Sequence, residues 1–95
     1  MGAIRDTYFS DYGMSDSDVD AVVSRCRNAR GDDLDLILDV VNAVNPGIAR
    51  FLFANLTVGV GYDTMSKSQY IPMKRSDFQG YRRKVIYCLN QIWVH

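Results

Sequence analysis

The spacing of apolar side chains is the feature that most limits the folds open to this chain. These side chains recur at steps of three and four in several short stretches, the spacing of one face of an α-helix. The stretches are separated by the helix-breaking residues Gly13, Gly31, Pro46, Gly61 and Pro72. The pattern predicts an all-α protein, a compact bundle of four to five short helices.

Two short helices are expected first. An aromatic or aliphatic residue at every fourth position predicts a helix over residues 3–12, which stops at Gly13. Ser15 is a favourable N-cap and predicts a second helix that ends near Ala29. The apolar stripe of this second helix contains Val19, Val22, Val23 and Cys26.

The clearest helical pattern follows Gly31. Its expected apolar stripe is Leu34, Ile37, Leu38, Val41 and Val44, opposite Asp32, Asp35, Asp39 and Asn42. Asn45-Pro46 then favours the start of a fourth helix, with apolar residues Ile48, Phe51, Leu52, Leu56 and Val60. Residues 57–61 combine glycines with β-branched residues, so a helix and a short strand both remain open there.

One or two helical turns are expected over residues 62–68, and an extended segment around Pro72. Ser76 and Gln79 match a capping box at the start of a last helix, residues 75–93. The expected inward stripe of that helix is Phe78, Tyr81, Val85, Cys88, Leu89 and Ile92. Gly80 lies inside it at a cost of about 1 kcal/mol relative to Ala, and a close neighbour and simple tolerance both explain it.

The chain of 95 residues suits a single domain, residues 1–95, with a helical support bundle (1–60) and a helix-turn-helix-like segment (61–95). Helical spacing predicts a core of Leu34, Ile37, Leu38, Val41, Phe51, Leu52, Tyr81, Val85 and Leu89. On that basis Leu38→Ala is expected to cost about 2–5 kcal/mol.

The net charge of zero conceals two oppositely charged parts. Residues 1–63 hold ten Asp and five Arg, a net charge of −5, whereas residues 64–95 hold one Asp and six Lys or Arg, a net charge of +5. Such a chain offers an acidic surface to a basic partner and a cationic one to an anionic partner. Mutual attraction of the two parts within the fold is the equally weighted alternative.

Cys26 and Cys88 each lie in an apolar helical pattern, which favours buried free thiols over a disulfide. Together with the lack of a signal-peptide pattern or a membrane-spanning run, this predicts a cytoplasmic protein without membrane contact.

Catalysis is not expected. The single histidine, His95, has no implied partner, and no apolar pocket is predicted around any aspartate. Asp16, Asp18 and Asp20 resemble the start of a calcium loop, but Ala21 and Arg27 occupy positions that need Gly and Glu. The prediction is therefore a protein that is not an enzyme and holds no metal or cofactor.

One basic segment is the strongest candidate for a binding site in the sequence. Lys and Arg before and within the last helix could neutralise phosphates, and Arg or Gln could pair with base edges. The candidate nucleic-acid-binding residues are Lys74, Arg75, Ser76, Gln79, Arg82 and Arg83. A solvated helix face is the plainer interpretation of the same residues.

The same segment carries a family resemblance. Gly61-Tyr62-Asp63, Lys74-Arg75-Ser76 and Tyr81-Arg82-Arg83-Lys84 resemble the helix-turn-helix of sigma-70 region 4 over residues 61–89. They are also similar to small helix-turn-helix regulators of phages of Gram-positive bacteria. The resemblance implies a DNA-binding transcriptional regulator encoded by a phage or mobile element, with the last helix in the major groove of double-stranded DNA. Residues 1–60 would then form a support or homodimerisation bundle.

A second hypothesis comes from the acidic part of the chain. A compact phage or mobile-element protein could inhibit or adapt a host enzyme that handles nucleic acid, as an anti-CRISPR protein does. The acidic face of Asp32, Asp35 and Asp39 would then occupy a basic channel of the host protein.

Overall fold

The computed structural model describes residues 4–94. Two short 3-10 turns, η1 (Ile4–Asp6) and η2 (Phe9–Tyr12), precede the first α-helix. The other elements in chain order are α1 (Asp16–Arg27), α2 (Asp32–Val44), the 3-10 turn η3 (Pro46–Ile48), α3 (Ala49–Thr57), α4 (Tyr62–Ser66) and α5 (Arg75–Val94). No strand occurs within residues 4–94, so the all-α prediction is confirmed.

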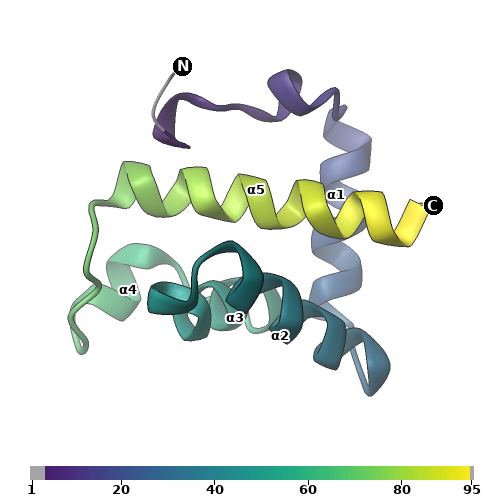
Figure 1. Ribbon diagram of the computed structural model, residues 1–95. Coiled ribbons are helices and arrows are strands. Elements are labelled where there is room, and N and C mark those ends of the chain that lie inside the picture. Colours follow the sequence, from purple (N-terminus) through teal and green to yellow (C-terminus); the bar gives the residue numbers. More distant parts are fainter. Residues whose placement is uncertain (1–3, 95) are drawn as a thin grey trace.

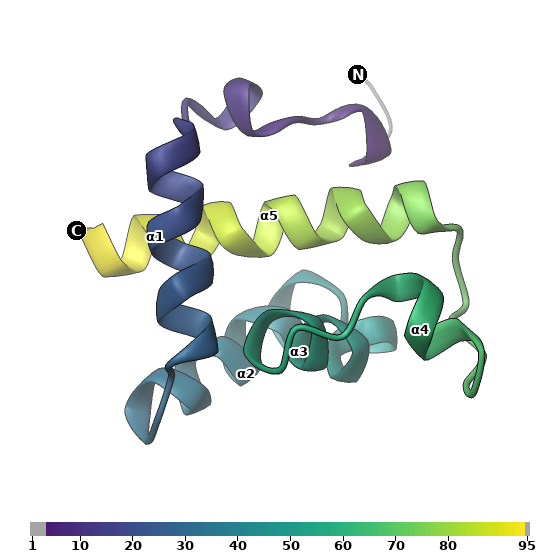
Figure 2. The same cartoon turned by 180° about the vertical axis from the view of Figure 1, so that it is seen from behind.

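Helix α5 runs through the middle of the molecule (Figure 1). The N-terminal segment lies along one side of it, α2, α3 and α4 lie on the other side, and α1 crosses it steeply. The view from behind shows the same order (Figure 2). The last helix in the described chain therefore supplies contacts to nearly every other element.

The helix starts follow capping chemistry in α1 but not in α5. The Ser15 hydroxyl accepts a bond from the backbone N–H of Asp18 (3.2 Å), and the Asp18 carboxylate accepts one from the N–H of Ser15 (2.9 Å). The predicted capping box at Ser76 is wrong. Helix α5 already begins at Arg75, so Ser76 lies inside its first turn, where it cannot act as the N-cap.

The predicted core is correct in most positions. Fully buried side chains from α2, α3 and α5 form its centre: Ile37, Val41, Leu52, Leu56, Phe78, Val85, Ile86 and Leu89. Two expected core residues, Leu34 and Tyr81, are half-buried instead.

The predicted burial of Leu38 is wrong, because 45% of this residue is exposed. Helix α2 has more apolar residues than one stripe needs, and its spacing fits two rotations about the helix axis. The fold buries Ile37, Val40 and Val41, which turns Leu38 outward. Ile92 is likewise 48% exposed, because the end of α5 continues past α1 (Figure 1).

Two backbone segments also differ from the expected pattern. In place of one helix over residues 3–12, η1 and η2 are separated by Thr7 and Tyr8; residue 3 lies outside the described part. Helix α3 ends at Thr57, and residues 58–61 are neither helix nor strand. The left-handed backbone of Gly59, with φ of 92°, redirects the chain there.

The connection between α4 and α5 spans residues 67–74. This is longer than the turn of three or four residues that joins the helices of a helix-turn-helix. None of the described helices is long and apolar enough to span a bilayer.

Candidate functional site

The six predicted nucleic-acid-binding residues fall into two groups. Lys74, Arg75 and Ser76 are exposed at the start of α5. Nη1 of Arg75 lies 3.7 Å from Oδ2 of Asp63, a loose ion pair between exposed groups. Such pairs contribute little to stability, so Arg75 remains accessible. Gln79, Arg82 and Arg83 are half-buried.

Arg82 lies on the side of α5 that faces the core, between Phe78 and Leu89 in the helical repeat. Its Nε donates a hydrogen bond of 2.6 Å to Oδ1 of the buried Asn55. The amide nitrogen of Asn55 in turn donates to the carbonyl oxygen of Val60 at 3.0 Å. Burial lowers the pKa of Arg82, and the positive charge of Arg27 lowers it further. Arg82 therefore belongs to an internal polar network.

Arg83 holds the N-terminal segment. Its Nε donates to the Thr7 carbonyl at 2.6 Å, and its Nη2 donates to the Arg5 carbonyl at 3.0 Å. The guanidinium also lies 4.9 Å from the centre of the Tyr8 ring, within cation–π range. Two of the predicted phosphate or base contacts are thus already bonded within the chain.

Gly80 is explained by the same contact. A Cβ at position 80 would clash with the Ile4 carbonyl oxygen, and it would lie 2.6 Å from the Ile4 carbonyl carbon and 2.9 Å from the Arg5 nitrogen. The missing side chain lets the N-terminal backbone rest directly on α5. Stacking of Tyr12 on Tyr87, with ring centres 4.5 Å apart, fixes the far end of the segment.

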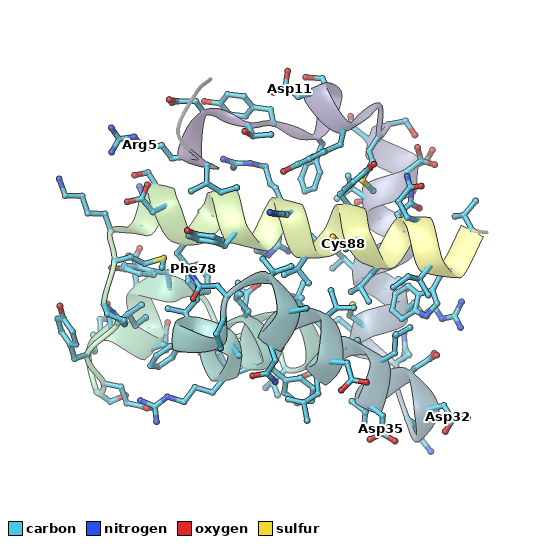
Figure 3. All side chains as sticks on the ribbon, in the orientation of Figure 1. Arg5, Asp11, Asp32, Asp35, Phe78 and Cys88 are labelled. Carbon is cyan, nitrogen blue, oxygen red and sulfur yellow. The ribbon has the colours of Figure 1, made fainter. Side chains whose placement is uncertain are left out.

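The second predicted site forms one exposed face of α2. We call it the acidic stripe: Asp32, Asp35, Leu38, Asp39, Asn42 and Ala43, all exposed. Figure 3 shows Asp32 and Asp35 pointing away from the body of the protein. In the described chain, no cationic nitrogen lies within 4.0 Å of the carboxylates of Asp32, Asp35 or Asp39.

Asp33, in the same helix turn, behaves differently. Arg25 donates to both of its carboxylate oxygens, at 3.0 and 3.1 Å, and this bond lowers the pKa of Asp33. The Arg25 guanidinium also stacks over the Trp93 ring at 4.4 Å. Arg25 thereby links the start of α2 to α1 and α5, and it holds the N-terminal end of the acidic stripe in position.

A hollow of about 310 Å³ lies beside α3 and α4. It is lined by Arg50, Phe51, Ala54, Val60, Thr64, Met65, Ser68 and Gln69. These residues offer hydroxyl, amide and guanidinium groups, but no carboxylate, imidazole or thiol for acid–base or nucleophilic chemistry. His95 lies outside the described residues.

Sequence reasoning missed three residues that matter in this arrangement. Asn55 lies in an apolar stretch, Arg27 occupies a position where a calcium loop needs Glu, and the helical spacing places Leu38 in the core. The signal for Asn55 was present, because a lone amide among Phe51, Leu52 and Leu56 requires a buried partner.

Comparison of the chain with protein-family models, curated proteins and solved structures finds no match.

Proposed function

We propose that this chain is a binding protein whose acidic stripe docks onto a basic surface of another protein. It would act as an inhibitor or adaptor of an enzyme that handles nucleic acid. The observation that carries the proposal is a row of exposed carboxylates beside one exposed leucine on a firmly anchored helix, with no cationic nitrogen of residues 4–94 within 4.0 Å of them.

The geometry of the acidic stripe supports this function. Asp32, Asp35 and Asp39 cover about 10 Å of helix, at a rise of about 1.5 Å per residue. Their helix is held by the buried Ile37, Val40 and Val41, so the carboxylates are presented with little loss of freedom on binding. Leu38, 45% exposed, offers an apolar contact at one edge of this face.

The DNA-binding hypothesis has less support. Arg82 and Arg83 would have to contact phosphate or base edges, yet each donates hydrogen bonds inside the fold. Helix α5 is also enclosed by other elements on several sides (Figures 1 and 2). A recognition helix needs one long face free to enter the major groove.

The test compares three forms of the immobilised protein in a nuclease-treated bacterial extract. These are the wild type, a variant carrying Asp32→Asn, Asp35→Asn and Asp39→Asn, and a control carrying Asp6→Asn, Asp16→Asn and Asp20→Asn. The control changes net charge equally, at exposed positions outside α2. A true partner is retained by the wild type and the control and is lost by the α2 variant.

The captured protein is then purified, and its dissociation constant is measured at low and high salt. We expect affinity to fall as salt rises, because charge complementarity is screened. Equal binding by the α2 variant would contradict the proposal. Salt-sensitive binding of random duplex DNA by the wild type, weakened by Arg75→Ala, would favour the regulator hypothesis instead.

A further inference from the structure

Two arginines flank the loop of residues 58–61, where α1, α3 and α5 meet. The Arg27 guanidinium lies against the backbone of Gly59, so that a Cβ there would be 2.7 Å from Cζ and 2.8 Å from Nη1. Arg82 is attached to the same loop through Asn55, which bonds the Val60 carbonyl. Figure 2 shows this loop leaving the end of α3 beside α1. Two cations from helices far apart in the sequence thus lie beside one short loop, close enough for the charge of Arg27 to act on Arg82.

Neither guanidinium forms an ion pair with a carboxylate of residues 4–94. Within residues 4–94, no carboxylate oxygen lies within 4.0 Å of Arg27 or Arg82. The Cys26 thiol is near enough to Arg82 to interact with it electrostatically, but burial raises the pKa of this thiol to about 11. The thiol is therefore neutral at pH 7. Asn55, the only hydrogen-bond partner of Arg82 in the described chain, is neutral as well.

The arginines also have free donors. Arg82 uses only Nε, and its two terminal nitrogens make no hydrogen bond with any described residue. Neither terminal nitrogen is fully enclosed, because the one enclosed side-chain nitrogen or oxygen without a partner in residues 4–94 is Nε1 of Trp93. Arg27 is exposed and makes no side-chain hydrogen bond there. Both guanidinium groups therefore have unused donors at the surface beside this loop.

We propose that Arg27 and Arg82 bind the phosphate group of a phosphate monoester, or free phosphate. Two adjacent positive charges match a dianion, and guanidinium donors fit the oxygens of a phosphate. The bound group would supply the counter-charge that a partly buried arginine otherwise lacks. The site is separate from the acidic stripe and involves none of its residues.

The test is a titration of the full chain with sodium phosphate at constant ionic strength, with sodium chloride as the balancing salt. Nitrogen-edited NMR follows the Nε–H signals of Arg27 and Arg82, and a thermal melt is recorded alongside. We expect saturable shifts at both arginines and a melting temperature that rises with phosphate, because a ligand that binds only the folded state stabilises it. Nucleoside 5′-monophosphate is titrated in parallel. Tighter binding than free phosphate would assign the site to a nucleotide, and equal binding would assign it to the phosphate group alone.

Arg27→Gln is the decisive variant, because Arg27 is exposed and its side chain makes no hydrogen bond or ion pair within residues 4–94, so we expect the variant to fold. It should weaken phosphate binding about tenfold, the effect of losing one charge-assisted contact of about 1.4 kcal/mol. Arg50→Gln is the matched control, an exposed arginine at the other end of α3 with the same charge change. It should bind like the wild type.

Three results would overturn the proposal. The first is the absence of saturable shifts with both phosphate and the nucleotide. The second is an equal loss of binding in the Arg27 and Arg50 variants, which would indicate a general charge effect. The third is binding of duplex DNA, whose phosphodiesters carry one charge each, without binding of either monoester probe.

Discussion

Helix α2 keeps three of its four carboxylates in solvent, whereas α5 directs two of its four cationic side chains toward other segments. Side-chain length explains the contrast. An aspartate carboxylate is two bonds from the backbone, so its helix position decides its exposure. An arginine has a long apolar stem that can lie on the core while its guanidinium reaches a distant acceptor. A run of Asp in a helix is therefore better evidence of a surface than a run of Arg.

The largest expected effect sharpens the description of α2. Ile37→Ala should lower the free energy of unfolding by about 2–5 kcal/mol, because Ile37 is fully buried and its removal leaves a cavity. Leu38→Ala, one residue further along, should change it by less than about 0.5 kcal/mol. Urea unfolding of both variants tests the rotation of α2. Similar losses for the two residues would mean that the acidic stripe does not face solvent as described.

The next effect concerns α5. Arg82→Ala removes a hydrogen bond from a charged donor and leaves Oδ1 of the buried Asn55 without a partner, which should cost about 1.5–3 kcal/mol. Lys84→Ala, on an exposed side of the same helix, should cost less than about 0.5 kcal/mol. Chemical denaturation of the two variants measures the difference. Equal losses of stability in the two variants would place Arg82 in solvent and restore it as a candidate for nucleic-acid contact.

The smallest effect has the opposite sign. Asp35 and Asp39 are four residues apart on one helix, so their like charges repel each other. Asp39→Asn should stabilise the protein by about 0.2–0.5 kcal/mol at low salt, and the gain should vanish at 1 M salt, where screening is strong. Thermal melts at the two salt concentrations test this. A loss of stability at low salt would reveal a cationic partner for Asp39 within the fold.

Much of the architecture was predictable because it depends on local chemistry. The Ser15 cap, the left-handed Gly13 and the Asn45-Pro46 start each act through neighbouring residues. The rotation of α2 was not predictable in this way. It depends on which of two apolar stripes meets α3 and α5, and the spacing within α2 is the same for both.

The candidate sites show the same difference between local and long-range determinants. The exposure of Asp32, Asp35 and Asp39 followed from their side of an amphipathic helix. The placement of the Arg82 and Arg83 guanidinium groups depended on acceptors at Asn55 and Thr7, which lie 27 and 76 residues away in the chain. Helical periodicity contains no information about such distant partners.

The central place of α5 has a consequence for biosynthesis. Because α1, α2, α4 and the N-terminal segment all pack against this helix, the core cannot close until residues near 94 have left the ribosome. Until then, the apolar faces of the helices synthesised earlier would remain exposed, as they are in chaperone substrates. The native core should therefore form only after α5 has been synthesised.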